Sequence, residues 1–350
     1  MRAIILTAFG SAEQFRLAKP PRPDPQPGEL RIRIHAVAFN PSDYQRRQGS
    51  LTAGPLPIIL GSDVAGVVDA IGTGVTAFAV GDEVYSFLLG GRISGGAYAE
   101  YVCRRVEFVA HKPRNLSFAQ AAAVVTVGLT ARQCLEQARL QPGEPVFVTG
   151  GSGGVGAMVI QLARHAGAGP IFTTSGSERS ARYLVDTLGV PRERLLYYAG
   201  LAREQLAQTL HELNGGRFFR VAIDCVGGAM TGLCCDTVDF EGHVISIVNG
   251  PRDDSHPAGE DDENRLFNRS AAFHFVMLSA LGTYGPPEAW PVYGRQLATL
   301  TDLFEAGGLE PPPIVEVGDL SVETVRRAHA LLECGHIHGK LVMLVCAAWG

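Results

Sequence analysis

The chain has 350 residues, of which 46% are hydrophobic and 19% are charged, which predicts about two soluble globular domains. The formal net charge of −5, with scattered lysines and arginines, argues against a nucleic-acid partner. Seven cysteines form no CxxC pair, which argues against a disulfide framework or a zinc knot and predicts a reducing, cytoplasmic location. No apolar run approaches the ~18 residues of a membrane span, and the N-terminus lacks a signal-peptide pattern, so no membrane association is expected.

The first third of the chain has the pattern of β-strands. In GELRIRIHAVAFN (28–40), apolar residues alternate with Arg31, Arg33 and His35, which is the period of a half-buried strand with His35 facing outward. Further short apolar segments, separated by glycine-rich turns, are GVVDAIG, GDEVYSF and AYAEYVCRR. Together they predict a compact, barrel-like β domain that ends near Pro113.

A long helix follows, and after it strands and helices alternate. The segment 116–140 is Ala-rich, and Ser117 with Gln120 forms a capping box at its start. From 145 to 280, apolar strand segments alternate with helical segments over 156–166, from about Glu178, and over 202–213; the strand segments are PVFVTG, PIFTTS, RLLYY, RVAIDCV, HVISIV and AAFHFVML. This alternation predicts a parallel sheet built from βαβ units.

The last part of the chain contains a polar loop, two helical patterns and a final strand pattern. Residues 250–266 form a polar, acidic loop, which is either a solvated surface excursion or a mobile flap near the carboxyl edge of the sheet. Helices are predicted over about 288–306 and 322–333, and LVMLVC near the C-terminus has the pattern of a strand. We expect this tail to pack on the first β domain, with the α/β domain inserted between them.

The strongest single motif is the glycine loop in VFVTGGSGGVG. It has GxGxxG spacing, follows an apolar strand directly and opens a helix. Glycines allow a tight turn and close approach of the backbone to a pyrophosphate, and the helix N-terminus offers unpaired N–H groups. The motif predicts dinucleotide binding by Gly151, Ser152, Gly153, Gly154, Val155 and Gly156.

The residues after the second strand of this domain indicate which nucleotide is bound. NAD sites usually place an acid there to hold the ribose 2′-hydroxyl, but this chain has the acid-free run TTSG. Hydroxyls and arginines, which suit a 2′-phosphate, follow. Glu178 argues in the other direction, although an acid also fits the first turn of a helix. The sequence favours NADPH over NADH, with the candidate residues Ser175, Gly176, Ser177 and Arg179.

Several motifs occur in one order along the chain: NPSD (40–43), GSDVAGVVDAIGTGV (61–75), GDEV (81–84), SGGAYAEY (94–101), AAAVVTVGLTA (121–131), GGSGGVG (150–156) and GHIHGK (335–340). With them, essentially the whole chain resembles the medium-chain dehydrogenase/reductase superfamily, most closely its zinc-free quinone oxidoreductase and ζ-crystallin branch. The resemblance implies an α/β fold with a GroES-like β-barrel catalytic domain (1–124 and 309–350) and a Rossmann domain with a doubly wound parallel sheet (125–308). It also implies a homodimer formed by edge strands, with 271–278 as the candidate edge.

The resemblance also bears on a catalytic metal. Zinc-containing relatives hold the metal on a cysteine, a histidine and a second cysteine, and these positions fall here on Asn40, Ser62 and Thr126. None of these is a good zinc ligand, because zinc prefers thiolate, imidazole or carboxylate. The structural-zinc loop is missing as well, since the segment 86–100 contains no cysteine. We therefore expect no zinc, and we expect Asp63 to form hydrogen bonds within the pocket wall.

Further site residues are implied by the resemblance. Asn40 and Tyr44 fall where the family lines the pocket beside the nicotinamide, so Asn40 is expected to position a substrate oxygen or the carboxamide. Tyr44 is expected to donate a hydrogen bond or a proton, with a packed tyrosine and protonation by water as the alternative. Some relatives place this tyrosine one residue later, where Gln45 stands. The other candidate cofactor-binding residues are Thr130, Tyr198, Val226, Ile247, Asn249 and Lys340, of which Lys340 either reaches a phosphate or lies solvated at the surface.

Without a metal, the chemistry favours conjugated acceptors. A metal acts as a Lewis acid that stabilises an alkoxide, whereas hydride transfer to a quinone or to the β-carbon of an enone leaves delocalised charge that modest hydrogen-bond donors can stabilise. The sequence therefore predicts a zinc-independent NADPH-dependent oxidoreductase that reduces quinones or the C=C bond of α,β-unsaturated carbonyl compounds. The alternatives are an enoyl-thioester (CoA or ACP) reductase and an NADPH-binding structural or scaffold protein without significant turnover.

Overall fold

A computed structural model describes residues 1–51, 54–88, 95–248, 265–335 and 337–345. The chain forms two compact units, Met1–Leu129 with Ser279–Gly350, and Thr130–Leu278. Helix α2 (Phe118–Ala138) runs from one unit into the other and begins with the expected capping box, in which Ser117 N donates to Gln120 Oε1 and Gln120 N donates to Ser117 Oγ. The unit boundaries differ from the predicted ones mainly because 279–308 pack with the first unit.

The first unit contains two β-sheets. In the larger sheet the strands follow the order β15-β16-β3-β5-β6-β8, with β7 paired to β3, and the smaller sheet has the order β2-β1-β4. The strands are β1 (Ala3–Leu6), β2 (Phe15–Ala18), β3 (Glu29–Ala38), β4 (Ile58–Ile59), β5 (Asp63–Ile71), β6 (Glu83–Phe87), β7 (Tyr101–Arg105), β8 (Val109–His111), β15 (Ile314–Asp319) and β16 (Lys340–Leu344). Because β16 pairs antiparallel with β3, the prediction that the C-terminal tail packs on the first β domain is confirmed.

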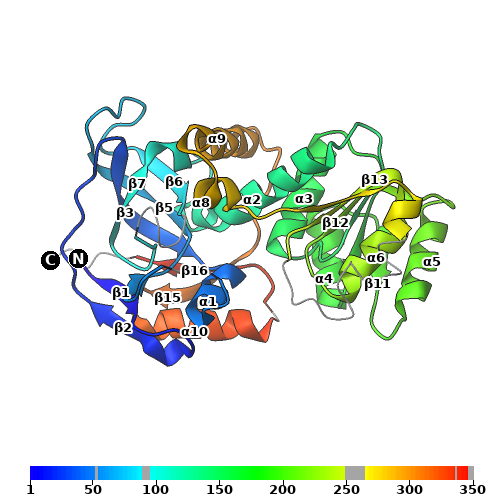
Figure 1. The fold of residues 1–350 in the computed structure, drawn as a ribbon, viewed down its shortest axis with the longest axis horizontal. Helices are drawn as coiled ribbons and strands as arrows, with labels where there is room; N and C mark the ends of the chain where they lie inside the picture. Colours follow the sequence, from blue (N-terminus) through cyan, green and yellow to red (C-terminus); the bar gives the residue numbers. More distant parts are fainter. Residues whose placement is uncertain (52–53, 89–94, 249–264, 336, 346–350) are drawn as a thin grey trace. The chain divides into compact units, whose positions relative to one another are not determined.

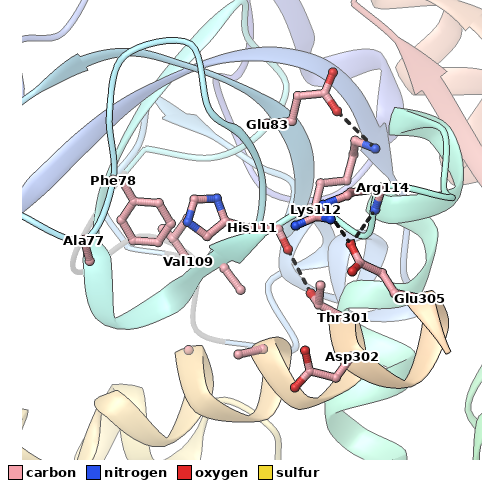
Figure 2. Close-up of a pocket in the computed structure, with 13 residues that line it drawn as sticks. Ala77, Phe78, Glu83, Val109, His111, Lys112, Arg114, Thr301, Asp302 and Glu305 are labelled. Atoms are coloured by element: carbon pink, nitrogen blue, oxygen red, sulfur yellow. Dashed lines mark hydrogen bonds and ion pairs between the residues drawn. The ribbon is translucent and has the colours of Figure 1, made fainter.

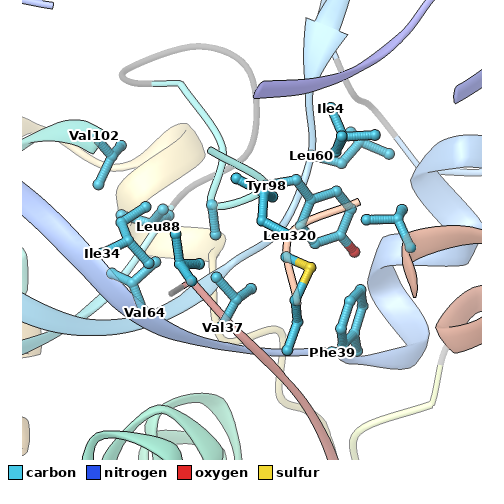
Figure 3. Packing of buried hydrophobic residues seen from close by; sticks show 14 of the residues in the cluster. Ile4, Ile34, Val37, Phe39, Leu60, Val64, Leu88, Tyr98, Val102 and Leu320 are labelled. Atoms are coloured by element: carbon cyan, nitrogen blue, oxygen red, sulfur yellow. The ribbon is translucent and has the colours of Figure 1, made fainter. Parts of the chain in front are cut away.

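Alternating side chains of these strands form the core of the first unit. In β3, Leu30, Ile32 and Ile34 point inward and are at most 1% exposed. Figure 3 shows Ile34 of β3 with Val64 of β5 and other members of this cluster. His35 lies on the face of β3 opposite to Ile34, as expected, but it is only partly exposed, because its ring stacks on Phe118 of α2 at a centroid distance of 4.4 Å.

The helices of the first unit flank these sheets. They are η1 (Ala12–Gln14), α1 (Pro41–Gln48), η2 (Val106–Phe108), α8 (Ala280–Tyr284), η5 (Pro287–Ala289), α9 (Pro291–Glu305) and α10 (Val322–Cys334). α1 and α10 lie side by side (Figure 1), joined by an ion pair between Arg47 and Glu333 at 2.6 Å. α9 packs on β8 and η2, and the Tyr85 hydroxyl of β6 donates to the Leu297 carbonyl at 2.6 Å. These contacts explain why 279–308 belong to the first unit.

The second unit is a parallel sheet with helices (Figure 1), as predicted. Its strands are β9 (Val146–Val148), β10 (Ile171–Ser175), β11 (Leu195–Tyr197), β12 (Phe219–Asp224), β13 (Val238–Ser246) and β14 (Ala272–Phe275). Its helices and helical turns are α3 (Gly154–His165), α4 (Glu178–Arg182), η3 (Tyr183–Thr187), η4 (Arg192–Arg194), α5 (Arg203–Leu213) and α6 (Ala229–Thr237).

The strand order of the second unit is that of a dinucleotide-binding sheet. It runs β11-β10-β9-β12-β13-β14, which is 3-2-1-4-5-6 when the strands are counted from β9. The order reverses beside β9, directly before the glycine loop, and ligands bind at the carboxyl ends of strands at such a reversal. β14 lies at the edge of the sheet, where the sequence placed its candidate edge strand. Most of the acidic loop, 250–264, lies outside the described residues.

None of the described helices is long and apolar enough to cross a membrane.

Candidate active site

The glycine loop of the second unit connects β9 to α3. Gly150 adopts a left-handed backbone with φ of 66°, and its carbonyl accepts from Gly153 N at 2.9 Å. A Cβ atom on Gly151 would lie 2.1 Å from Thr173 Oγ1, and one on Gly156 would lie 2.3 Å from the Gly150 carbonyl oxygen. The loop therefore requires glycine at both positions. It brings a bare backbone and the start of a twelve-residue helix to the carboxyl end of β9, and this arrangement fits a dinucleotide pyrophosphate.

Two threonines of β10 hold this loop, and the sequence analysis assigned neither of them a role. Thr174 Oγ1 accepts from Gly150 N at 2.8 Å, and Thr173 Oγ1 accepts from Gly151 N at 3.1 Å while donating to the Val148 carbonyl at 2.7 Å. Both side chains are at most 2% exposed. The sequence signal for them is the pair of hydroxyl residues at the end of the second strand, where NAD-binding sites usually have an acid.

The predicted 2′-phosphate residues follow β10 at the same edge of the sheet. Ser175 Oγ donates to the Ser177 carbonyl at 3.0 Å, and Ser177 Oγ caps α4 by accepting from Ser180 N at 3.2 Å. A Cβ atom on Gly176 would lie 2.3 Å from the Tyr198 hydroxyl, so that hydroxyl lies directly against the Gly176 backbone. The Arg179 side chain is exposed and makes no hydrogen bond or ion pair with any described residue.

Asp224, at the end of β12, organises the neighbouring strand ends, and sequence reasoning missed it. Its fully buried carboxylate accepts hydrogen bonds from two main-chain groups and three hydroxyls: Val226 N, Gly227 N, Thr149 Oγ1, Thr231 Oγ1 and Ser246 Oγ, at 2.6–3.0 Å. This network fixes the turn that carries Val226, which is 52% exposed. The sequence signal for this role is a single acidic residue at the end of the apolar strand segment RVAIDCV. Ile247 follows β13 at the same edge, and Asn249 lies outside the described residues.

A buried polar cluster in the first unit contains the predicted catalytic residue Asn40. Lys340 Nζ, at the start of β16, donates to Asn40 Oδ1 at 2.6 Å and to the Phe39 carbonyl at 2.9 Å. Asn40 Nδ2 donates in turn to Asp63 Oδ2 at 2.8 Å. Asn40, Asp63 and Lys340 are at most 6% exposed. The carboxamide of Asn40 is therefore fixed by an ammonium on one side and a carboxylate on the other.

Asp63 links this cluster to α2, which confirms that it forms hydrogen bonds with its surroundings. Thr126 Oγ1 donates to Asp63 Oδ1 at 2.5 Å, and Thr126 N donates to Oδ2 at 3.3 Å. Burial raises the pKa of Asp63, and the charge of Lys340 opposes this shift. Burial likewise lowers the pKa of Lys340, opposed by Asp63 and then by Asp43. The two residues thus support each other's charged form against the cost of burial.

Asp43 forms a second acidic centre beside the first. Its Oδ2 accepts from Asn40 N at 2.8 Å, and its Oδ1 accepts from Ser62 Oγ at 3.3 Å. Arg46 donates to Ser62 Oγ at 3.2 Å. Burial raises the pKa of Asp43 to about 6, and Arg46 is the largest influence that opposes this shift. Opposite charges therefore balance within the cluster, which is held almost entirely away from water.

The residues of this cluster do not fit a zinc ion. Asn40, Ser62 and Thr126, the positions at which the zinc relatives carry ligands, all hydrogen-bond to the carboxylates of the cluster. The Lys340 ammonium donates directly to the Asn40 oxygen and would repel a cation there. Among the described residues, no group of three or more His, Cys, Asp and Glu side chains could hold a metal ion.

The other predicted residues have varied surroundings. The alternative that Lys340 lies solvated at the surface is wrong, because its ammonium is buried and donates to two oxygens of the first unit. Phosphate binding by Lys340 stays a prediction. Tyr44 is half-buried on α1, and within the described residues its hydroxyl makes no hydrogen bond. Thr130 is 5% exposed on α2, one helical turn after Thr126.

A separate cavity of about 610 Å³ lies in the first unit between β8 and α9. Figure 2 shows ion pairs at its rim, with Lys112 Nζ 3.2 Å from Glu83 Oε2 and Arg114 Nε 3.7 Å from Glu305 Oε1. None of the predicted site residues lines it. The cavity therefore is not part of the candidate active site.

Comparison with known proteins places this geometry in a family. Residues 26–114 match the alcohol dehydrogenase GroES-like domain, and residues 202–343 match the zinc-binding dehydrogenase family. The chain is 33% identical to a 2-methylene-furan-3-one reductase of Solanum lycopersicum over 98% of its length and 79% of the relative's.

A second relative and a solved structure agree. A quinone oxidoreductase of Pseudomonas aeruginosa is 31% identical over 97% of this chain and 95% of its own length. The solved NADPH complex of a mycobacterial protein superimposes with a TM-score of 0.82 at 27% identity, covering 98% of this chain and 100% of that one. With its GroES-like sheet, its 3-2-1-4-5-6 nucleotide sheet and these relatives, the chain belongs to the medium-chain dehydrogenase/reductase superfamily.

Proposed function

We propose that this protein is an NADPH-dependent oxidoreductase that reduces quinones or the C=C bond of α,β-unsaturated carbonyl compounds without zinc. The relatives named quinone oxidoreductase and 2-methylene-furan-3-one reductase support this substrate class. The NADPH complex of the mycobacterial neighbour supports the cofactor. The observation that carries the proposal is the hydrogen-bonded chain Lys340–Asn40–Asp63. Asn40 stands at a position where the zinc relatives carry a metal ligand, and here its carboxamide is already bound by the Lys340 ammonium and the Asp63 carboxylate.

The second unit would hold the cofactor. The loop from Gly151 to Gly156 and the start of α3 suit the pyrophosphate, because they offer main-chain N–H groups without side chains in the way. Ser177 and Arg179 suit the 2′-phosphate, and Tyr198 suits the adenosine. Thr130, Val226 and Ile247 remain proposed contacts of the ribose and nicotinamide. NADPH, when bound, supplies the hydride.

Hydroxyl groups of the first unit would act on the substrate in different ways. The Thr126 hydroxyl already donates to Asp63, so it can only accept a hydrogen bond from a bound molecule. The Tyr44 hydroxyl has no protein partner among the described residues and can donate. We therefore assign to Tyr44 the hydrogen bond that stabilises negative charge on the substrate oxygen. Asn40 is a positioning residue, because its carboxamide is held on both sides.

The proposal is tested by following NADPH oxidation with three acceptors: a naphthoquinone, a small enone and a short enoyl-CoA. We expect turnover with the quinone or the enone, unchanged after dialysis against a chelator. Fastest turnover with the enoyl-CoA would favour the enoyl-thioester alternative. NADPH binding without reduction of any acceptor would favour the structural alternative, and loss of activity on chelation would refute the zinc-free proposal.

The Tyr44 assignment has its own test. Tyr44→Phe should lower kcat by about 10²-fold or more if the hydroxyl is the proton donor, since general acid catalysis contributes about 10²–10⁴-fold. Tyr101→Phe, at a partly buried tyrosine of β7, is the matched control and should leave kcat nearly unchanged. A loss of no more than about 2-fold in Tyr44→Phe would leave protonation to water.

We further propose that the protein is a homodimer joined through β14. β14 is the last strand in the order of this sheet, and its Phe275 is 56% exposed. An edge strand can pair with a strand of another chain. Light scattering after size-exclusion chromatography should give twice the mass of the chain. A charged substitution at the exposed residue of this strand, Phe275→Glu, should shift the mass to that of the monomer, and a monomeric wild-type protein would contradict the proposal.

A further inference from the structure

The acid that follows β10 is the residue that most directly opposes NADPH binding. In the run IFTTSGSERSAR (171–182), Glu178 is the single acidic residue, three positions after the end of the strand. An acid in this region usually selects NADH, because it accepts from the ribose 2′-hydroxyl and repels a 2′-phosphate. A preference for NADPH therefore requires that the charge of Glu178 be compensated.

Arg192 provides this compensation. Its NH2 group donates to both carboxylate oxygens of Glu178, at 2.9 Å and 2.8 Å. Arg192 belongs to η4, which leads directly into β11, the strand that pairs with β10. The pKa of Glu178 is lowered, first by the hydrogen bond from Arg192 and then by the charges of Arg192 and Arg182. The acid is therefore held ionised and paired by Arg192, on the turn that leads into the neighbouring strand.

The pairing leaves the local charge positive. Arg179 makes no ion pair with a described residue, so its guanidinium is available to an anion, whereas the charge of Glu178 is already matched. Both partners of the pair are roughly half exposed, with side-chain exposures of 57% for Arg192 and 51% for Glu178. The pair should therefore contribute little to folding stability, and its effect should lie in the electrostatic field at the nucleotide.

We infer that Arg192 is a specificity-determining residue, which selects NADPH over NADH by neutralising Glu178. The inference rests on the proposed use of NADPH. Arg192 acts here through Glu178 and not by touching the phosphate. A direct contact between Arg192 and the 2′-phosphate would contradict the inference.

The test measures the Kd of NADPH and of NADH for the full-length protein by fluorescence titration. Arg192→Met should weaken NADPH binding by about 5- to 20-fold, because the carboxylate then faces a phosphate of charge near −2. NADH binding should change by less than about 2-fold, since NADH carries no 2′-phosphate. Equal melting temperatures of the variant and the wild type would exclude a folding defect.

A double substitution separates the proposed mechanism from direct phosphate binding. Arg192→Met combined with Glu178→Gln should restore NADPH affinity to within about 2-fold of the wild type, because no carboxylate remains to be neutralised. If the double variant binds NADPH as weakly as Arg192→Met alone, Arg192 contacts the phosphate itself and the inference is overturned.

A matched control tests for a general charge effect. Arg194 lies on the same turn, with its guanidinium over the Phe172 ring at 6.0 Å, and Arg194→Met changes the net charge equally. It should leave the ratio of the two Kd values nearly unchanged, and an effect equal to that of Arg192→Met would overturn the inference. Wild-type protein that binds NADH as tightly as NADPH would refute the cofactor proposal instead, so the two failures are distinguishable.

Discussion

The candidate site regions of the two units consist of different kinds of groups, main-chain groups in the second unit and charged and polar side chains in the first. In the second unit, main-chain groups and small side chains gather at the carboxyl edge of the sheet, and one contiguous stretch supplies the glycine loop. In the first unit, four side chains from distant parts of the sequence form one largely buried chain of hydrogen bonds: Asn40, Asp63, Thr126 and Lys340. The first kind of site leaves a local sequence pattern, whereas the second is defined by tertiary pairing.

The comparison predicts that the first unit is the more sensitive to loss of a single charge. Lys340→Met would leave Asp63 and the Asn40 oxygen without their cation, and removing one partner of a buried pair costs roughly 3–5 kcal/mol. The melting temperature of the variant should fall strongly. Lys112→Met is the control, because Lys112 is equally buried at 6% exposed but its partner Glu83 is 54% exposed and can be solvated. An equal or larger loss in the control would contradict the role given to Lys340.

A smaller effect is expected from the acid that organises the second unit. Asp224→Asn keeps the shape of the side chain but removes its charge and turns an amide group toward hydrogen-bond donors, which should cost roughly 2–4 kcal/mol. Asp239→Asn is the control, because Asp239 accepts one main-chain hydrogen bond, from Phe240 N. It should lower the free energy of unfolding by less than about 1 kcal/mol. Thermal unfolding of both variants makes the comparison. Equal losses would mean that the Asp224 network does not stabilise the sheet edge.

The sequence predicted the fold and the nucleotide edge well, because both depend on local periodicity and on residues with special backbone freedom. The parallel strands, the glycine loop and the edge strand β14 all lie where their patterns indicated. Residues 279–308 were assigned to the other domain, since a helical pattern does not reveal which sheet its apolar face covers.

The charged cluster could not be read in the same way. Lys340 follows a glycine and precedes an apolar strand, a pattern equally typical of a surface lysine, and only its pairing with Asn40 reveals its burial. Asp224 and Thr173 were missed for the same reason, because partners such as Thr149 and Gly151 lie far from them in the sequence. Asp63 was correctly expected to form hydrogen bonds, although its link through Asn40 to the charge of Lys340 was not foreseen.

The pH dependence of stability tests the same contrast between the two units, since the first unit buries His329 and Asp43, whose pKa values are shifted by burial. Burial lowers the pKa of His329, whose Nε2 lies 3.0 Å from the Tyr98 hydroxyl, to about 3. The unfolded chain binds this proton below about pH 6.5 and the folded chain does not. The stability from neutral His329 is therefore complete above pH 6.5 and decreases as the pH falls toward 3, by roughly 1–3 kcal/mol after allowance for relaxation.

Asp43 should act in the opposite direction. Its pKa of about 6 in the folded chain lies above its ordinary value, so its contribution grows as the pH falls through 6 and is lost as the pH rises. The melting temperature should therefore decrease less on acidification in His329→Gln than in the wild type, and more in Asp43→Asn. Parallel melting curves of all three proteins between pH 7 and pH 4 would contradict both assignments.

The smallest effect is expected at Thr126, where the charged cluster meets α2. Thr126→Val removes the hydroxyl that donates to Asp63 Oδ1 but keeps the volume of the side chain and the main-chain donor at 3.3 Å. Because Thr126 is only half-buried, water can replace part of the lost hydrogen bond, so the free energy of unfolding should fall by only about 1 kcal/mol. Thr126→Ser keeps the hydroxyl and should cost less than about 0.5 kcal/mol. If serine costs as much as valine, the methyl group carries the interaction through packing, and the hydrogen-bonded chain ends at Asp63.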